Sequence, residues 1–394
     1  MKKNVKVLQI IHDLEPPFEL VAKSYAESFL GCSVTTIVLK GERDENFCNE
    51  IYGEVFFLEL SSQALKGFKV KAILKVRSLL RTIPPNIVIG HRYKPFFIAV
   101  ILNCFFSLDA VFGVVHHYGF LDRKSRRLFS RFWKENVELI AVSNPVCDYL
   151  KQRVQEKKEK IHLVQQAYFK PILLTKKEAL KFLSLPDSNY YFGAVGRLVE
   201  KKNHQFLIEA FSKINDDSHL IIIGDGRLSG ELKAIAKDLG IERRTHFLGQ
   251  VEMAHRYLKA FDCFIFPSTE KEEFGIVLLE AMFAELPIIC SDSPGPMSIA
   301  AGFAHIFRSG DQEQLTTQMR SIRKKTTDEL FKSSKAGLKK LDEDYSQPKM
   351  FASIIRLLAV AVPVRAAEAL FVRPIVRLSD AAVSATARTA AAEQ

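Results

Sequence analysis

The sequence has little of what disulfide-rich, zinc-binding or membrane-spanning proteins contain. Its six cysteines include no Cys-x-x-Cys pair and no cysteine–histidine spacing typical of zinc, so free thiols are expected. The N-terminus has no signal-peptide pattern. The longest apolar stretch, residues 96–115, is interrupted by Asn103, Ser107 and Asp109, and therefore predicts a buried helix and strand rather than a membrane span. We expect a cytoplasmic protein.

The bulk composition is that of a globular α/β protein with an excess of positive charge. A chain of 394 residues with 47% hydrophobic and 26% charged residues is long enough for two domains. The net charge of +11 favours anionic partners, but it does not choose among nucleic acid, a membrane surface and a phosphorylated substrate.

Apolar runs of strand length alternate with helical patterns in two successive series. Strands are expected at 5–11, 33–39, 54–58, 86–90, 110–115, 139–142 and 161–164, and then at 191–195, 219–223, 245–248, 263–266 and 287–290. Helices are expected at 19–30, 64–81, 204–214, 230–239, 254–260 and 275–285. This alternation predicts two doubly wound, Rossmann-like domains that face a central cleft.

The expected domain boundaries follow from the same pattern. Residues 1–168 form the first domain and residues 169–345 the second, while a helix over 346–361 is expected to return to the first domain. Residues 362–394 are rich in alanine and arginine and contain no lysine, and we expect a flexible tail.

Two basic segments of the first domain also carry apolar residues, which recur at helical spacing in the first of them. They are residues 64–81 and residues 123–134. One interpretation is an ordinary solvated face over a core helix, and the other is docking on an anionic lipid or an acidic acceptor.

The second series of strands ends in glycines and cations. Gly196 directly follows an apolar strand, and Arg197 and Lys202 lie in the loop that opens the next helix. Close backbone approach with nearby cations is what a phosphate group needs, although a solvated basic loop is the alternative. Gly224 and Gly249 end the next two strands and are further candidates for the same site, although glycines in ordinary tight turns are the alternative.

The segment 264–282 carries the strongest signal. An apolar strand stops at Pro267, a charged loop contains Glu272, and an apolar helix begins near Gly275 and contains Glu280. A carboxylate inside an apolar helix is costly unless it has a partner, so Glu280 is either a structural pair or a ligand-binding group. Free backbone N–H groups near Gly275 suit a phosphate.

These motifs resemble the retaining GT-B glycosyltransferases of family 4, a group with many bacterial lipopolysaccharide and capsule enzymes. The resemblance is specific over residues 193–282 and extends over 1–360. It implies that Arg197 and Lys202 hold the donor diphosphate, that Glu272 lies by the donor sugar and that Glu280 bonds the ribose. Gly196, Gly224, Gly249, Phe274, Gly275 and Ile276 are then expected to line the donor site. His116, or alternatively His117, takes the place of the histidine near the reacting sugar.

Four departures from the family pattern are visible. Leu14-Glu-Pro-Pro-Phe18 stands where a glycine-rich acceptor loop is expected, and Glu273 replaces the usual glycine after the first glutamate. Residues 293–297 replace the usual Gly-Gly-x-Pro-Glu, and Gln166-Ala167 stands where Asn-Gly is common. The first departure weakens the site assignments in the first domain, and the others leave the sugar identity open.

The resemblance implies a metal-independent hexosyltransferase that moves a sugar, with retention, from a nucleotide diphosphate sugar to a glycan or lipid-linked acceptor of the cell surface. Closure of the two domains would align donor and acceptor. No cofactor and no nucleic-acid partner is expected. We do expect a peripheral association with the inner face of the cell membrane. An epimerase of the same architecture and a non-catalytic basic binding protein are the alternatives.

Overall fold

A computed structural model of the chain describes residues 5–15, 17–168 and 170–361. Contacts divide the chain into two units, which we call the first domain (residues up to Gln166 and from Gln347 onward) and the second domain (Ala167–Ser346). The tail expected over 362–394 lies outside the described residues.

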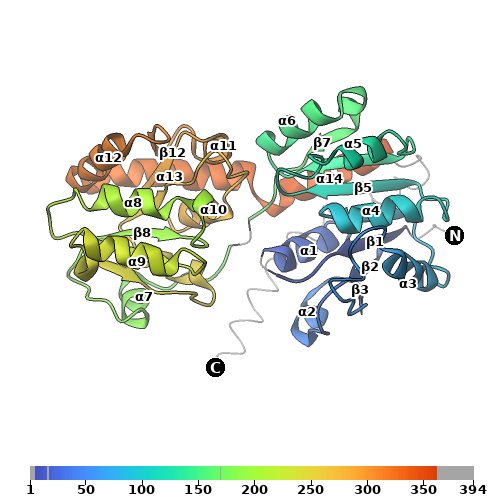
Figure 1. Cartoon of the computed structure of the whole chain (residues 1–394), viewed down its shortest axis with the longest axis horizontal. Helices are drawn as coiled ribbons and strands as arrows, with labels where there is room; N and C mark the ends of the chain where they lie inside the picture. The colour runs from blue at the N-terminus through green and yellow to red at the C-terminus, as the bar shows by residue number, and fades with distance from the viewer. Residues whose placement is uncertain (1–4, 16, 169, 362–394) are drawn as a thin grey trace. The chain divides into compact units, whose positions relative to one another are not determined.

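The first domain is built on a seven-stranded, fully parallel sheet (Figure 1). Its strand order is β3-β2-β1-β4-β5-β6-β7. The strands are β1 (Lys6–Ile11), β2 (Ser33–Val38), β3 (Glu54–Phe57), β4 (Ile87–His91), β5 (Ala110–Val115), β6 (Val137–Ala141) and β7 (Ile161–Leu163). The helices are α1 (Phe18–Glu27), α2 (Glu45–Glu50), α3 (Val70–Leu80), α4 (Tyr93–Leu102), α5 (Lys124–Ser130), α6 (Asn144–Arg153), the 3₁₀ helix η1 (Gln155–Lys160) and α14 (Gln347–Ala361).

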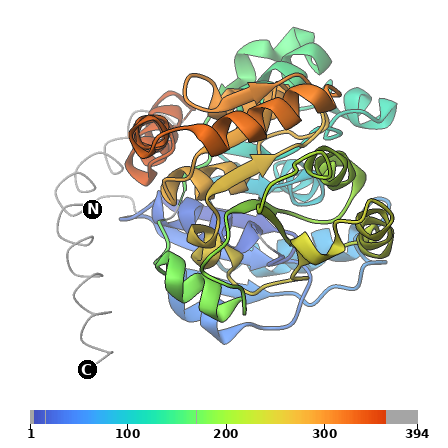
Figure 2. The same ribbon diagram turned by 90° about the vertical axis from the view of Figure 1, so that its left-hand side faces the viewer.

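The second domain repeats this plan with six parallel strands in the order β10-β9-β8-β11-β12-β13 (Figures 1 and 2). They are β8 (Tyr191–Val195), β9 (His219–Ile223), β10 (Thr245–Phe247), β11 (Cys263–Phe266), β12 (Ile288–Ser291) and β13 (His305–Phe307). The helices are α7 (Lys176–Phe182), η2 (Glu200–Lys202), α8 (His204–Phe211), α9 (Ser229–Asp238), η3 (Glu242–Arg244), η4 (Ala254–Ala260), α10 (Ile276–Phe283), α11 (Pro294–Ala300), α12 (Gln312–Lys324) and α13 (Thr327–Asp344).

Continuous apolar strands explain why each sheet is covered on both faces. On β9, Leu220 and Ile222 belong to one core cluster, whereas Ile221 and Ile223 belong to the other. Alternate side chains of a strand point to opposite faces, so a run without polar alternation is buried only when helices pack on both sides. The sequence-based prediction of two doubly wound Rossmann-like domains is confirmed.

Several helices differ from the sequence-based expectation. The helix expected over 64–81 begins only at Val70, because Gly67 and Lys69 adopt left-handed backbone angles. The segment 254–260 forms a 3₁₀ helix rather than an α-helix. Strand β13 and helices α11, α12 and α13 were not predicted.

Helix α14 belongs to the first domain. The side chain of Gln347 donates a hydrogen bond to Glu27 at 3.3 Å, and the Ser24 hydroxyl lies 3.4 Å from the sulfur of Met350. The C-terminal helix thus packs against α1, although the residues between Gln166 and Gln347 belong to the second domain.

The strand orders define where each sheet is suited to bind a ligand. Along each sheet the strand numbers first fall and then rise, and this reversal lies between β1 and β4 in the first sheet and between β8 and β11 in the second. Loops at the carboxyl ends of strands on either side of such a reversal leave a crevice in doubly wound folds. The relevant loops are those after Ile11 and His91 in the first domain, and after Val195 and Phe266 in the second.

Candidate functional site

The loop after β8 is held open by glycines. Gly196 has a φ of +157°, and its N–H donates to the Ile223 carbonyl at 2.9 Å. A Cβ atom on Gly224 would lie 2.0 Å from the Gly196 oxygen, so only glycine fits there. The Gly224 N–H donates to the Gly249 carbonyl at 2.7 Å, which links the ends of three neighbouring strands.

The loop after β11 closes over the loop after β8. The Thr269 N–H donates to the Lys201 carbonyl at 2.9 Å. Gly275, with a φ of +94°, then caps the N-terminus of α10, and a Cβ atom there would lie 2.8 Å from the Phe266 ring. Two loops that are distant in sequence therefore meet beside a helix N-terminus, where free N–H groups favour an anion.

Two lysines and two glutamates form an ion-pair network between these loops. The Lys202 ammonium lies 2.6 Å from Glu272, and Lys201 lies 3.0 Å from Glu273 and 3.7 Å from Glu272. Glu272 is buried, with 5% of its surface exposed. Burial lowers the pKa of Lys202, and the charge of Glu272 opposes this shift. The network therefore places two ammonium groups and two carboxylates, with no net charge, at the reversal point of the sheet.

Glu280 lies in the second turn of α10 and is mostly enclosed by protein. Burial raises its pKa to about 7, and the Lys202 charge partly opposes this shift. Burial also raises the pKa of Tyr168, and the charge of Glu280 adds to that effect. Lys202 thus acts electrostatically on both Glu272 and Glu280, as expected if the three groups share one site.

The remaining candidates of the second domain occupy different positions. The Arg197 side chain is exposed, and within the described part of the chain it makes no ion pair with Glu272 or Glu280. Phe274 is buried against Tyr345, with ring centroids 5.9 Å apart. Ile276 is the first residue of α10. Lys202 and Glu272 are in direct contact and the Lys202 charge also acts on Glu280, whereas Arg197 forms no ion pair with either glutamate in the described residues.

In the first domain, His116 follows the carboxyl end of β5 and packs against a second histidine. Its Nε2 lies 3.4 Å from Nδ1 of His91, and the two rings are stacked 5.7 Å apart. Burial holds the pKa of His116 well below its usual range and lowers that of His91 to about 3. Both rings are therefore neutral at physiological pH.

A buried glutamine fixes the tautomers of these histidines. The Gln9 amide nitrogen donates to the Ala22 carbonyl and to Thr36 Oγ1, both at 3.1 Å, so its oxygen accepts from His91 Nε2 at 2.9 Å. His91 then presents an unprotonated Nδ1 to His116. It follows that His116 carries its proton on Nε2 and keeps Nδ1 as an acceptor.

The segment that replaces the expected glycine-rich loop places an aromatic ring against His116. Phe18 meets His116 edge to face with ring centroids 5.2 Å apart, and the Arg92 guanidinium lies 3.9 Å from the centroid of the Phe18 ring. Arg92 forms an ion pair with Asp13 and has a φ of +68°, which is rare for a residue with a side chain. Such strain often occurs at functional sites.

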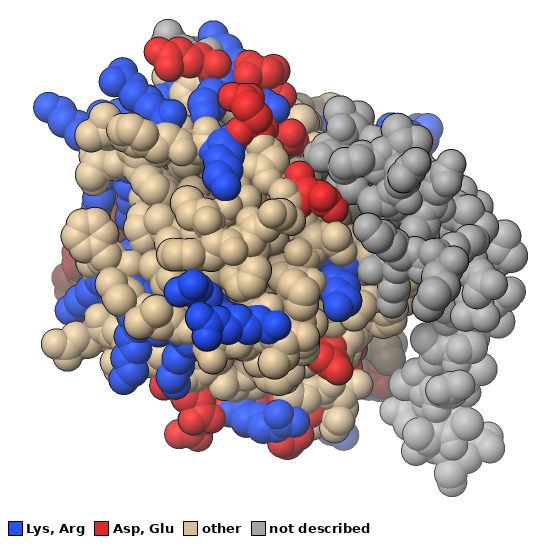
Figure 3. All heavy atoms as spheres, turned by 90° about the vertical axis from the view of Figure 1, so that its right-hand side faces the viewer, with Lys and Arg blue, Asp and Glu red and all other residues tan. Residues whose placement is uncertain are grey.

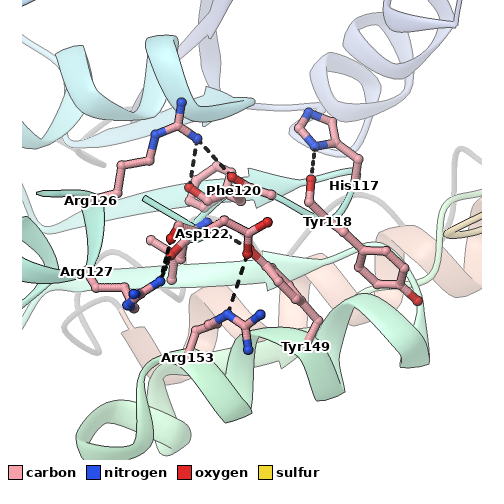
Figure 4. A network of polar contacts seen from close by, with 10 residues as sticks. His117, Tyr118, Phe120, Asp122, Arg126, Arg127, Tyr149 and Arg153 are labelled. Atoms are coloured by element: carbon pink, nitrogen blue, oxygen red, sulfur yellow. Dashed lines mark hydrogen bonds and ion pairs between the residues drawn. The ribbon is translucent and has the colours of Figure 1, made fainter. Parts of the chain in front are cut away.

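The loop that follows His116 is tied to α5 and α6 by polar contacts (Figure 4). Arg126 donates to the carbonyls of Gly119 and Phe120 at 3.0 and 3.1 Å. Tyr149 donates to Asp122 at 2.9 Å. His117, the alternative candidate, has its Nδ1 2.6 Å from the Tyr118 carbonyl oxygen.

Sequence reasoning missed several groups at these edges. His91 and Arg92 stand at the end of an expected strand, as His116 does, so the same rule would have found them. Gln9, in the middle of an apolar strand, gave a weaker signal. The pairing of Lys201 with Glu273 has no signal in the sequence, because the two residues lie in different loops and are 72 positions apart.

Two features are absent from the described residues. No group of three or more His, Cys, Asp or Glu side chains is arranged to hold a metal ion in residues 5–361, with 16 and 169 left aside. None of the helices in this same part of the chain combines the length and hydrophobicity needed to cross a membrane.

Comparisons with known proteins give consistent results. Residues 175–336 match the family model described as "Glycosyl transferases group 1". The chain is 25% identical over 325 residues to an uncharacterized glycosyltransferase, MJ1059, of Methanocaldococcus jannaschii, a match that covers 76% of this chain and 77% of the relative. It is 28% identical over 244 residues to the UDP-Gal:alpha-D-GlcNAc-diphosphoundecaprenol alpha-1,3-galactosyltransferase of Escherichia coli, covering 57% of this chain and 62% of that enzyme.

Among solved structures, HepE of Anabaena in complex with UDP superimposes with a TM-score of 0.75 at 16% identity, covering 90% of this chain and 100% of HepE. At this identity the likeness shows the fold alone. The family match thus lies within the second domain, and the superposition shows that the chain has the GT-B fold.

Proposed function

We propose that the protein transfers a sugar from a nucleotide diphosphate sugar to a glycan or lipid-linked acceptor, and that the donor binds the second domain. The observation that carries this proposal is the contact of Lys202 with the buried Glu272 at the reversal point of the second sheet, with Glu280 on the adjacent helix α10. Lys202 neutralises the diphosphate as it leaves, with Arg197 as the second cation from the same loop. Stabilising charge where it develops is usually the largest contribution to such catalysis.

The carboxylates have separate roles in this proposal. Glu272 keeps Lys202 charged and lies by the donor sugar, while Glu280 accepts hydrogen bonds from the ribose. Backbone N–H groups at the start of α10, from Gly275 and Ile276, bind a phosphate oxygen. We further propose that the anomeric configuration is retained, that neither metal nor cofactor is needed, and that His116 Nδ1 accepts a hydrogen bond from the donor sugar.

The acceptor belongs to the lipid-linked glycans of bacterial surface polysaccharide synthesis in this proposal. Two observations support this class. The curated E. coli relative has a diphosphoundecaprenol-linked sugar in its name. The first domain also exposes apolar side chains among basic ones, most strongly Phe68, which is 82% exposed just before α3.

Helix α3 and the residues before it favour peripheral contact with an anionic membrane. Ala72, Val76 and Leu80 face the core, while Val70 and Leu74 are exposed beside the lysines of the same segment. On the face of the first domain in Figure 3, a broad uncharged surface is bordered by many lysine and arginine side chains and by some aspartates and glutamates. Exposed apolar groups with flanking cations are typical of interfacial membrane binding.

Thermal shift measurements with a panel of nucleotide diphosphates and their sugars, in the presence of EDTA, test the proposed function. One nucleotide should raise the melting temperature of the parent protein by several degrees at roughly a hundred times its Kd. Lys202→Ala should weaken the response to the nucleotide diphosphate, whose full charge Lys202 neutralises, more than the response to its sugar. Glu280→Gln should weaken both responses, while Glu285→Gln, two residues beyond the end of α10, should keep both. Equal stabilisation of all four proteins would reject the proposed donor site.

The histidine pair gives a separate prediction. His91→Phe removes the acceptor that fixes the His116 tautomer, and kcat/KM should fall about tenfold, as for other supporting groups around a reacting centre. His91→Asn should recover part of the loss. The ¹⁵N shifts of His116 should report a single Nε2-protonated tautomer in the parent and a mixture in His91→Phe. An unchanged tautomer would show that His91 only fills space.

A further inference from the structure

A surface hollow of about 730 Å³ lies on the first domain between α5 and the segment that joins α6 to η1. Its cationic lining residues are Lys124, Arg127, Arg131, Arg153 and Lys157. Only two carboxylates, Asp122 and Glu156, line it as well. The hollow therefore has an excess of positive charge that is concentrated on a few adjacent turns.

Much of this charge is not neutralised by the protein. Arg153 pairs with Asp122 at 3.5 Å, and that carboxylate also accepts a hydrogen bond from Tyr149 (Figure 4). In the part of the chain that the structure describes, no carboxylate lies within ion-pair distance of Lys124, Arg127 or Arg131. An anion that enters the hollow therefore meets cations without displacing a competing carboxylate.

One of the cations is fixed in place. The Arg127 guanidinium uses one terminal nitrogen to donate to the carbonyls of Leu121 and Asp122, at 3.0 and 2.5 Å. The loop after β5 thus holds this side chain, which lines the hollow, and Figure 4 shows its contacts with that loop. A preorganised guanidinium loses little conformational entropy when it binds an oxyanion.

Two exposed apolar side chains of the same segment lie at or near the hollow. Leu128, which lines it, is 55% exposed, and Phe132, one turn further along, is 75% exposed. Phe129 between them points inward and packs on Phe97, with ring centroids 5.0 Å apart. The exposed pair therefore adds nothing to the core, and it lies beside cations that suit an anionic headgroup.

We propose that this hollow binds the phosphate of a lipid, with the cations on the phosphate oxygens and Leu128 and Phe132 against the hydrocarbon. The ligand class is a lipid phosphate ester, from either an anionic phospholipid or a polyprenyl diphosphate. The inference deepens the membrane part of the proposed function and rests on it, but it does not depend on the donor site.

Co-sedimentation with vesicles tests the hollow. Three compositions are used: phosphatidylcholine alone, phosphatidylcholine with phosphatidylglycerol, and phosphatidylcholine with a small fraction of polyprenyl diphosphate. Lys124→Gln combined with Arg131→Gln should weaken partitioning to the preferred vesicles roughly thirtyfold, from two lost surface cations. Leu128→Ala combined with Phe132→Ala should weaken it about tenfold. Arg127 is left intact because it also supports the loop.

The matched control replaces two exposed lysines of α9, Lys233→Gln with Lys237→Gln, which removes the same charge from the second domain. This control should bind vesicles like the parent. Preference for phosphatidylglycerol identifies a bilayer phospholipid, and preference for polyprenyl diphosphate identifies the acceptor. Parent-like binding by the hollow variants, equal loss in the control, or no preference for either anionic vesicle would overturn the proposal. Nucleotide-induced thermal shifts should be unchanged in all variants, so a failure here is distinct from failure of the donor site.

Discussion

Lys202→Ala is expected to lower kcat/KM for sugar transfer roughly a thousandfold, the cost of removing a group that stabilises charge developing in the transition state. The Lys202 ammonium lies at the end of β8, within 2.6 Å of Glu272 and 4.9 Å from the centre of the Phe266 ring. Its three N–H donors allow it to keep Glu272 as a partner while it binds a phosphate oxygen. The loss should appear mainly in kcat, because negative charge on the diphosphate grows as the glycosidic bond breaks.

Lys201→Ala is the matched control for this variant. The neighbouring lysine has the same charge and also lies beside Glu272, at 3.7 Å, but its shorter contact is to Glu273. If position rather than net charge matters, Lys201→Ala should change kcat/KM by about threefold or less. Comparable losses in both variants would show that the general field of the loop, and not Lys202 itself, acts on the donor.

Folding of the Lys202→Ala variant must be checked separately. Among the described residues, loss of the Lys202 ammonium group leaves the buried Glu272 carboxylate with only the more distant Lys201 as a cationic partner. A variant that lacks both charges, Lys202→Ala with Glu272→Gln, should recover thermal stability but not activity. Recovery of both would mean that the pair is structural.

The parts of this site that the sequence predicts are those fixed by local pattern. A strand that ends in Gly196 and a helix that begins near Gly275 follow from apolar runs and glycine punctuation alone. The carboxyl ends of parallel strands share one edge of the sheet, so Lys202 and Glu272 are expected on the same side before any coordinates are known. Their contact at 2.6 Å agrees with that expectation.

The parts that the sequence does not predict depend on contacts between distant segments. Gln9 and His91 lie 82 residues apart, and nothing in either segment alone shows that their side chains meet. The same holds for Phe18, whose ring lies against His116 only because α1 begins where a glycine-rich loop was expected. Short elements such as β13, with three residues, carry too little periodicity to be recognised.

Glu280→Gln is expected to have opposite effects on stability and on donor binding. Burial raises the pKa of Glu280 to about 7, so the folded protein favours the protonated form. The stabilisation from this raised pKa is fully present below the ordinary glutamate pKa and is lost as the pH rises through about 7. Glutamine is neutral at every pH and avoids this loss. At pH 8 the free energy of unfolding of the variant should therefore be about 2 kcal/mol higher than that of the parent. Denaturant titration without nucleotide measures this difference.

Donor binding should change in the other direction. An ionised carboxylate accepts hydrogen bonds from ribose hydroxyls more strongly than an amide, so affinity of the parent should increase as the pH rises from 6 to 8 and Glu280 loses its proton. The variant should bind the nucleotide roughly tenfold to a hundredfold more weakly at pH 8, with little dependence on pH. Isothermal titration at several pH values measures both effects. A variant that is less stable than the parent, or whose affinity still follows the pH, would show that Glu280 is a structural carboxylate rather than the group that binds the ribose. A residue whose removal stabilises the empty protein while weakening the complex is most simply explained as one kept for its ligand.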